Sequence, residues 1–362
     1  MKSLFDQTKL AGLQLKNRFM RSATYDGAAD SEGKVTDELC RIYKTLAQGE
    51  VGTIITGLTA VTDREQSYPG QMAIYDDTYI AGYKKLTDVV HAYGAQIILQ
   101  LACVGSQCIP NALEGKVMWG PSAIEDIGYS THPQEMTKED IRFVQDAFGK
   151  GALRAKQAGF DGVQLHGAHG YLLSKFLNPY YNQRTDEYGG HIENRARMVL
   201  ETYQAVRQKV GPEYPVLIKI NCDDFMNESG LSFEECKYVC RRLSELGMDA
   251  IEVSGGSRSS ARNKGPSRLS KRGPQSYFAD YAAELARELP VPIILVGGNR
   301  EPEALTRLIN ETQIEYISLS RTLISEPGLI RKWRENPVYE AKCGYCNKCY
   351  NPGGTKCILN QK

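Results

Sequence analysis

Two histidines and a tyrosine on one short, glycine-broken segment carry the strongest chemical signal in this sequence, His166-Gly-Ala-His169-Gly-Tyr171. They follow an apolar run, 160–165, that has the length and composition of a β-strand. The glycines break any helix that could continue from the run. The imidazoles and the phenol are therefore expected on the turn that leaves a strand. Two N–H donors and one O–H donor there can hold a carbonyl oxygen and deliver a proton beside it.

Two other interpretations of these histidines stay open. They could be half of a metal site, although no third ligand follows at a metal-like spacing. They could also be core histidines with satisfied hydrogen bonds, although two of the five histidines in the chain fall on this one turn.

The elements that would position these groups follow a repeating pattern. Short runs rich in Ile, Val and Leu alternate with segments of helical periodicity, as is typical of parallel strands buried on both faces. Eight such units predict an α/β fold, the (β/α)8 TIM barrel. The competing doubly wound sheet should carry a glycine-rich dinucleotide turn, and 22–27 is not one. The strands are expected at 19–24, 53–57, 96–101, 162–165, 216–220, 250–253, 293–296 and 317–319, and helices at 79–93, 138–158, 192–210, 233–246, 280–288 and 302–310.

Two insertions interrupt the alternation. The first, 104–134, follows the third strand and is expected to fold over the barrel mouth. The second, 255–278, follows the sixth strand and carries no acidic residue. It is either a solvated loop or an electrostatic lid for a phosphate-bearing nicotinamide or an acyl-CoA. Its basic residues are Arg258, Arg262, Lys264, Arg268, Lys271 and Arg272.

Barrel enzymes build their sites at the C-terminal ends of the strands. The first strand ends at Ser22-Ala23-Thr24-Tyr25, the second at the small Gly57, and the third and fifth carry Gln100 and Lys219. The seventh and eighth strands lead into Gly297-Gly298-Asn299 and Ser320-Arg321, where this fold usually binds phosphate. The pattern predicts a phosphate-bearing cofactor across the barrel mouth, and a flavin fits it.

The segment Asn182-Gln-Arg184-Thr-Asp186-Glu-Tyr188-Gly-Gly190, with Glu193-Asn-Arg195 and the histidine segment, resembles the Old Yellow Enzyme family of FMN-dependent ene reductases. The resemblance runs from Leu15 to Arg321. It implies that NAD(P)H reduces FMN, that His166 and His169 hold the oxygen of an enone or enoate, and that Tyr171 protonates the α-carbon after hydride transfer from flavin N5. The implied FMN contacts are Ala23, Gly57, Gln100, Lys219, Gly298 and Arg321.

The sequence departs from the family at one of these positions, Lys219, and at Tyr25. Lys219 stands where the family usually has arginine. Lysine keeps the positive charge of arginine but cannot form its bidentate hydrogen bonds. The other interpretation of Lys219 is a buried lysine paired with an acid. Tyr25, expected beside the substrate, stands where many members have a cysteine or threonine that modulates the flavin.

Four of the ten cysteines crowd the last twenty residues at the spacing C-x2-C-x2-C-x7-C. Three cysteines so spaced are more typical of an iron–sulfur run than of a zinc site. Dienoyl-CoA reductases and trimethylamine dehydrogenase, larger relatives of the family, carry a similar run that ligates a [4Fe-4S] cluster. The last spacing is shorter here, and no second flavin- and nucleotide-binding region follows before Lys362. A [4Fe-4S] cluster is the first interpretation, and zinc or free thiols are the others. The expected ligands are Cys343, Cys346, Cys349 and Cys357.

Composition limits the remaining classes. The 362 residues suffice for one barrel, expected over 1–335, and a Cys-rich C-terminal extension over 336–362. The net charge of +1 gives no global attraction to nucleic acid or to an anionic membrane. No apolar run reaches membrane-spanning length, and no signal peptide starts the chain, so a cytoplasmic enzyme is expected. The oligomeric state, including a homo-oligomer, stays open.

Two other functions compete with the ene reductase. A barrel lyase could use Lys219 as a Schiff-base lysine beside a phosphate site. A flavin- or metal-binding redox sensor could use the cysteine extension. A flavin absorption spectrum distinguishes an ene reductase from the barrel lyase. Consumption of NAD(P)H with an enone distinguishes it from the redox sensor.

Overall fold

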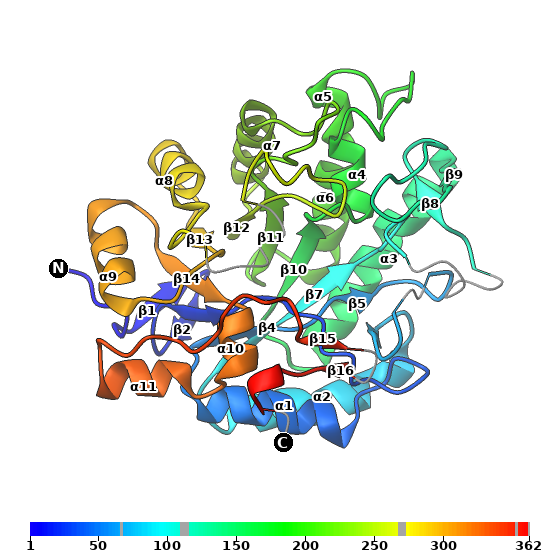
Figure 1. The fold of residues 1–362 in the computed structure, drawn as a ribbon. Coiled ribbons are helices and arrows are strands. Elements are labelled where there is room, and N and C mark those ends of the chain that lie inside the picture. The colour runs from blue at the N-terminus through cyan, green and yellow to red at the C-terminus, as the bar shows by residue number, and fades with distance from the viewer. Residues whose placement is uncertain (66–67, 109–115, 267–272, 352–353, 361–362) are drawn as a thin grey trace.

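Eight parallel strands close into a barrel in the computed structural model, which describes residues 1–65, 68–108, 116–266, 273–351 and 354–360 (Figure 1). Each strand pairs with its neighbours in chain order, and the pairings of β14 with β3 and of β7 with β10 complete the closure. The predicted TIM barrel is confirmed, and the doubly wound sheet is wrong. The strands are β3 (Phe19–Arg21), β4 (Thr53–Ile55), β7 (Gln96–Ala102), β10 (Gly162–Gly167), β11 (Val216–Asn221), β12 (Ala250–Ser254), β13 (Ile293–Leu295) and β14 (Tyr316–Leu319).

Helices surround this barrel and follow the sequence signals closely. The helix α3 starts at a capping box made by Thr137 and Asp140, and a positive φ at Gly159 ends the turn that follows it. The expected helix 192–210 is divided at Ala196 into two. The helices are α1 (Asp37–Gln48), α2 (Ile80–His91), α3 (Lys138–Gln157), α4 (Leu172–Leu177), α5 (Ile192–Arg195), α6 (Arg197–Val210), α7 (Phe233–Glu245), α8 (Ala279–Glu288), α9 (Pro302–Glu311), α10 (Arg321–Ser325) and α11 (Leu329–Glu335).

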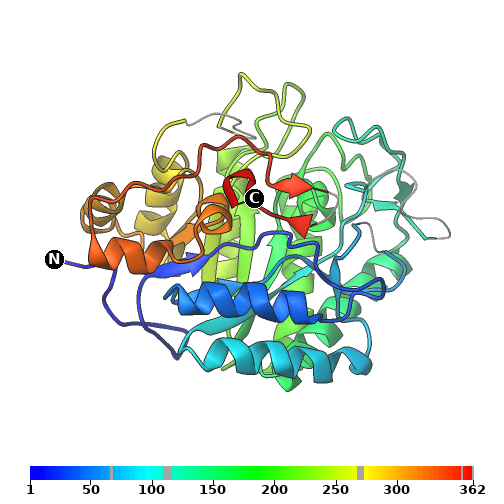
Figure 2. The same ribbon diagram turned by 60° about the horizontal axis from the view of Figure 1, so that its bottom comes forward.

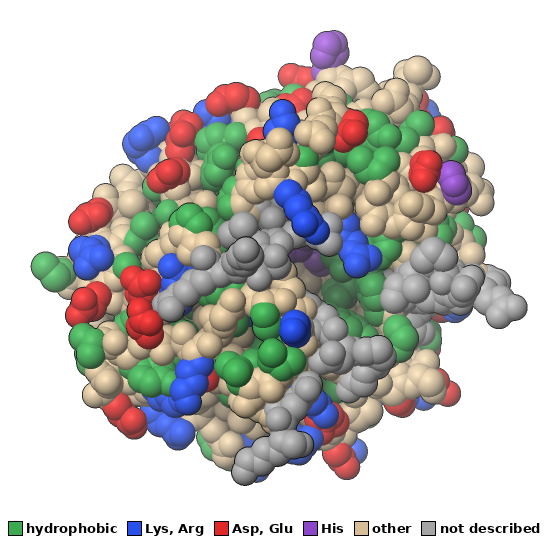
Figure 3. Space-filling view, in the orientation of Figure 1, with side chains coloured by type: hydrophobic (Ala, Val, Ile, Leu, Met, Phe, Trp, Pro, Cys, Tyr) green, Lys and Arg blue, Asp and Glu red, His purple; other side chains and the backbone are tan. Residues whose placement is uncertain are grey.

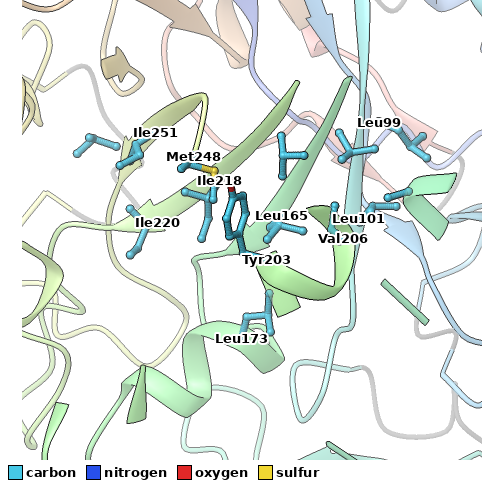
Figure 4. Close-up of a cluster of buried hydrophobic side chains, with 14 of the residues drawn as sticks. Leu99, Leu101, Leu165, Leu173, Tyr203, Val206, Ile218, Ile220, Met248 and Ile251 are labelled. Atoms are coloured by element: carbon cyan, nitrogen blue, oxygen red, sulfur yellow. The ribbon is translucent and has the colours of Figure 1, made fainter. Parts of the chain in front are cut away.

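The outward faces of the strands form the main apolar core with these helices (Figure 4). Leu165 and Ile218 from adjacent strands pack beside Tyr203 and Val206 of α6. Burying each such aliphatic side chain contributes about 1.5–3 kcal/mol. This layer therefore fixes the positions of the strands from outside, and the inner face is left to form the site.

The inward faces of the strands divide into two layers. The lower layer is apolar and includes Met20, Ile98, Leu217, Ala250 and Tyr316. An N-terminal hairpin of β1 (Thr8–Leu10) and β2 (Leu13–Leu15) adds two leucines to this layer and closes the bottom of the barrel. Side chains point the same way every second residue of a strand. The upper layer is polar and stands two residues farther along the same strands. Its residues are Ser22, Gln100, Lys219, Glu252 and Ser318.

The insertion after β7 and the C-terminal segment both lie at the upper end of the barrel. The insertion carries β8 (Trp119–Gly120), paired with β9 (Gln134–Glu135). The C-terminal segment leaves α11 and crosses the strand ends to β15 (Tyr350–Asn351) and β16 (Gly354–Thr355), as both views show (Figures 1 and 2). The Thr355 N–H donates to the Asp26 carbonyl oxygen in the loop after β3. No helix in the described part of the chain is long and apolar enough to span a membrane.

Candidate active site

A cavity of about 920 Å³ opens at the C-terminal ends of the barrel strands. In the view of Figure 3 the surface is hollowed near its centre, with a histidine side chain inside and Lys and Arg side chains around the rim. Of the residues expected to hold a cofactor or substrate, these line it: Ala23, Thr24, Tyr25, Gln100, His166, His169, Tyr171, Lys219, Gly297, Gly298, Asn299, Ser320 and Arg321.

Gly57 is the one expected cofactor contact that does not line the cavity. Its N–H donates to the Tyr43 hydroxyl at 3.0 Å. A Cβ on this residue would stand 2.8 Å from the Thr24 carbonyl oxygen. The glycine therefore allows close packing of the two neighbouring loops behind the site.

The two histidines and Tyr171 form one aromatic cluster. The ring centroids of His166 and His169 are 5.3 Å apart at 86°, and those of His166 and Tyr171 are 4.4 Å apart. His169 has a φ of +61°, which is uncommon for a residue other than glycine. Its N–H donates to Asn221 Oδ1, and its Nε2 lies 2.7 Å from Ser254 Oγ. These contacts hold the backbone in this conformation and fix the ring.

Both imidazoles are neutral at physiological pH. Burial, His169 and Lys219 lower the pKa of His166 well below its usual value. Burial and the nearby Lys219 lower the pKa of His169 to about 3. His166 Nδ1 has no hydrogen-bond partner among the described residues, although it is buried. A neutral imidazole carries one N–H donor, so the pair can hold an oxygen without protonating it.

Two further tyrosines, Tyr68 and Tyr129, line the cavity near this cluster, and neither was expected from the sequence. Tyr68 interacts with Tyr171 and lies 3.2 Å from Tyr129, hydroxyl to hydroxyl. The Tyr68 hydroxyl donates to the Gln107 carbonyl oxygen at 2.7 Å. Tyr68 and Tyr129 come from loops without a motif, so only the fold could bring them to Tyr171.

A polar chain crosses the floor of the cavity. Gln100 Nε2 donates to Gln164 Oε1 at 2.8 Å, and Gln164 Nε2 donates to Glu252 Oε2 at 2.8 Å. Lys219 Nζ lies 3.3 Å from the same carboxylate oxygen and donates to Ser22 Oγ. Lys219 therefore lines the cavity and is also paired with a buried acid. The sequence analysis missed Gln164 and Glu252, although both interrupt apolar strand runs at inward positions.

Glycines and a guanidinium form the far end of the cavity. Gly297 and Gly298 have φ values of +112° and +76°, and a Cβ on either would stand 2.7 Å from the Tyr277 ring. Arg321 interacts with the Tyr277 hydroxyl. Asn299 contributes differently, because its amide donates to the carbonyl oxygens of Leu295 and Ser318. It joins β13 to β14 and so positions the glycine turn.

No aspartate or glutamate lines the cavity in the described part of the chain, whereas Lys219, Arg258 and Arg321 do, and Glu252 lies beneath the floor, behind Lys219. Arg258 begins the basic loop, and its guanidinium stands 4.4 Å from the Tyr129 ring centroid. The two insertions therefore meet at the mouth. Arg262 and Lys264 are exposed, and the other basic residues of the loop, Arg268, Lys271 and Arg272, lie outside the described residues. The charge of this cavity favours an anionic ligand.

The C-terminal cysteines do not assemble a ligand set in the described structure. Cys349 is buried, Cys343 and Cys357 are half-buried, and Cys346 is exposed. Burial raises the pKa of Cys343, and its nearest thiol influences are Cys357 and Cys346. No three His, Cys, Asp or Glu side chains among the described residues are placed to share a metal ion. The predicted [4Fe-4S] cluster therefore rests on the cysteine spacing alone and stays a prediction.

The fold is a (β/α)8 barrel with its cavity at the strand ends, and the comparisons with known proteins identify its family. Residues 3–338 match the model of the NADH:flavin oxidoreductase / NADH oxidase family, and the chain belongs to this family. The NADH oxidase of Thermoanaerobacter brockii is 34% identical over 95% of this chain and 53% of its own length. The cinnamate reductase of Clostridium sporogenes is 31% identical over 99% of this chain and 57% of its own length. The chain thus spans about half the length of these relatives.

Solved structures give the same result for the fold. A 2-naphthoyl-CoA reductase in complex with 2-naphthoyl-CoA is 26% identical, with a TM-score of 0.88 over 96% of this chain and 54% of the other. An old yellow enzyme homologue from Zymomonas mobilis is 23% identical, with a TM-score of 0.81 over 97% of this chain and 98% of the other. The expected resemblance to the Old Yellow Enzyme family is confirmed.

The motif residues between Asn182 and Arg195 that carried this resemblance do not line the cavity. Arg184 pairs with Asp186 and donates to the carbonyl oxygens of Pro121, in the first insertion, and of Met136, just after it. Arg195 donates to the Leu177 carbonyl oxygen at the end of α4. The motif therefore anchors the insertion beside the barrel mouth.

Proposed function

We propose that this protein is an FMN-dependent NAD(P)H oxidoreductase that reduces the C=C bond of α,β-unsaturated carbonyl compounds. One observation carries the proposal: two neutral imidazoles and a phenol face the same cavity as a cation, an amide and a phosphate-type turn. The imidazoles and the phenol suit a carbonyl substrate, because they can bind its oxygen and donate a proton beside it. The cation, the amide and the turn suit a flavin mononucleotide.

The residues fit FMN by size, charge and hydrogen-bonding capacity. A cavity of about 920 Å³ can contain a flavin with room for a small substrate. Gly298 and Arg321 would hold the phosphate, and Gln100 and Lys219 the polar edge of the ring. Ser318 Oγ is a buried hydroxyl in the lining without a partner among the described residues, which a ligand would satisfy. When bound, FMN supplies a hydride acceptor for NAD(P)H and a hydride donor for the substrate.

The protein's own groups would act on the substrate carbonyl and on one proton. His166 and His169 would donate hydrogen bonds to the carbonyl oxygen, which makes the β-carbon more electrophilic. Tyr171 Oη would give its proton to the α-carbon and would regain one from water. Lys219 would stabilise negative charge at the ring edge, and Glu252 would keep it protonated in spite of its burial.

The names of two relatives support this substrate class. Cinnamate, the substrate in the name of one relative, is an enoate, in which the C=C bond is conjugated with a carboxylate. The other relative is bound to an aryl-CoA thioester. Both are anionic conjugated carbonyl compounds. The described lining of this cavity has three cationic side chains and no aspartate or glutamate, which suits such ligands. The physiological substrate is therefore expected to be an enone or an enoate.

Two measurements test the proposal. Purified protein should be yellow with a flavin spectrum, and heat should release FMN and no FAD, because the cavity has one phosphate-type turn. Steady-state NADH and NADPH consumption should then accelerate with an enone such as cyclohexenone. A colourless protein that also binds no added flavin would contradict the proposal and favour the lyase with Lys219. A flavoprotein that never transfers electrons to any enone or enoate would favour the redox sensor.

A further inference from the structure

The C-terminal segment contributes two side chains to the far end of the cavity, Tyr345 and Asn347. Both lie within the cysteine run, and neither is among the residues that the sequence analysis placed in the site. Arg321 Nη1 donates to Asn347 Oδ1 at 2.6 Å. The Arg321 guanidinium also stands 4.6 Å from the centroid of the Tyr345 ring. The segment thus contacts from two sides the arginine that lines the cavity beside the glycine turn.

Tyr345 has an unusual environment for a phenol. Its side chain is 4% exposed, and its hydroxyl has no hydrogen-bond partner among the described residues. Leaving a buried hydroxyl unpaired costs about 1–3 kcal/mol. A ligand oxygen in the cavity would remove this cost.

The backbone of this segment is also constrained. Tyr345 has a φ of +57° and Asn347 a φ of +59°. Asparagine tolerates this region, whereas for a bulky residue such as tyrosine it is an outlier that costs of order 1–3 kcal/mol. Such a conformation persists only where the surroundings fix it. The strained turn directs both side chains to the same guanidinium, as a binding site requires.

We propose that Tyr345 and Asn347 are binding residues for the terminal phosphate of the cofactor. Asn347 fixes the Arg321 guanidinium beside the glycine turn, where it binds the phosphate, and Tyr345 donates its hydroxyl to a phosphate oxygen. This inference rests on the proposed flavin function and adds the C-terminal segment to the site. It requires no metal at the cysteines, since the contacts come from the residues between them.

The test compares two flavins that differ only in the phosphate. Deflavinated full-length protein is titrated with FMN and with riboflavin, and the Kd of each is measured from the quenching of flavin fluorescence. Asn347→Ala should raise the Kd for FMN about tenfold, and Tyr345→Phe several-fold, as loss of one hydrogen bond to a charged group predicts. The Kd for riboflavin should change by less than about twofold in both.

Two substitutions in the same segment serve as controls. Tyr339→Phe also removes a phenol hydroxyl, one that donates to Glu326 outside the cavity. Asn360→Ala also removes an amide, one that donates to the Ser325 carbonyl oxygen.

A third variant, Asn347→Asp, keeps the size of the side chain and its tolerance of a positive φ, and it places a carboxylate against Arg321. It should therefore weaken FMN binding at least as much as Asn347→Ala. It remains informative if the alanine variant unfolds.

The possible outcomes separate this inference from the proposed function. Wild-type protein that binds neither flavin overturns the proposed function. Wild-type protein that binds FMN, with Asn347 and Tyr345 variants no weaker than the controls, overturns the inference alone. Equal weakening of FMN and riboflavin also overturns it, because the residues would then act on the ring or on the fold. Selective weakening of FMN in these variants supports it.

Discussion

Lys219 and Glu252 form an ion pair on adjacent strands at the floor of the cavity, with Nζ 3.3 Å from Oε2 and side chains 3% and 0% exposed. Glu252 also accepts hydrogen bonds from Ser22 and Gln164, so its charge is compensated on three sides. The lysine therefore has two tasks. It presents a cation to the cavity, and it keeps a buried carboxylate paired.

The first prediction follows from this pair. Lys219→Met should destabilise the protein by about 3–5 kcal/mol, because it leaves Glu252 buried without its cation. The double variant Lys219→Met/Glu252→Gln should recover most of that loss. Urea unfolding of both variants measures the difference. Equal stability of the single and double variants would show that the pair is not coupled.

The second prediction concerns the two imidazoles. His166→Ala or His169→Asn should weaken the binding of a phenol, which resembles an enolate, to the oxidised enzyme. A loss of about 1–3 kcal/mol is expected from an unpaired oxygen in a closed site. Flavin content should stay near that of the wild type. Spectral titration with a substituted phenol gives the affinities, and unchanged values in both variants would remove the assignment.

The third prediction separates the two half-reactions. Tyr171→Phe should leave reduction by NAD(P)H nearly normal, because that step needs no proton from the phenol. Reoxidation by an enone should slow by about a hundredfold or more, the usual scale of general acid catalysis. Stopped-flow absorbance of the flavin follows each half separately. Tyr129→Phe, which changes a phenol farther from the histidines, is the matched control. Equal slowing of both halves would mean that Tyr171 is structural.

The fourth prediction is a dependence of stability on pH. The pKa of His169 is lowered to about 3 in the folded state, against about 6.5 when unfolded. The unfolded chain therefore binds more protons below pH 6.5, and stability falls as the pH falls toward 3. His169 should lower the free energy of unfolding by about 2 kcal/mol when the pH falls from 7 to 5. His169→Asn keeps the backbone conformation and should lose less stability over that range. Urea unfolding at both pH values decides the point, and parallel losses would contradict it.

The fifth prediction addresses the cysteine segment. If Cys343, Cys346, Cys349 and Cys357 ligate a [4Fe-4S] cluster, anaerobically purified protein should contain about four iron and four sulfide per chain. Stoichiometric zinc without iron would keep the ligands and change the metal. Four thiols that titrate freely in metal-free, fully active protein would remove the idea. Metal analysis with thiol titration on one preparation distinguishes these outcomes.

The sequence predicted the barrel because each strand is a short apolar run between helical segments. It also predicted the part of the cavity lining that comes from the strand ends, since these ends meet at one rim. Helix α1 was missed, although Thr36 caps it and Asp37 and Glu38 begin its first turn. Its buried residues Leu39, Tyr43 and Leu46 recur at helical spacing, so the signal was present in the sequence and was overlooked.

The rest of the site depends on contacts between distant segments. Tyr68, Tyr129 and Tyr345 carry no local signal, and their place is decided by loops that fold back over the barrel. Glu252 had a local signal, an acid inside an apolar strand. It was not used because a buried strand was expected to be apolar on both faces. In a barrel the inner face of the upper layer belongs to the site.

The division of the barrel interior into an apolar and a polar layer has a consequence for engineering. Substitutions that raise stability by filling a core can be made around Leu217 and Tyr316, where packing and the hydrogen bond from the Tyr316 hydroxyl to the Lys9 carbonyl oxygen are at stake. Two residues farther along the same strands, the same substitutions would remove Lys219 or Ser318 from the cavity. Thermostability and catalysis can therefore be optimised independently in this protein, in separate halves of one barrel.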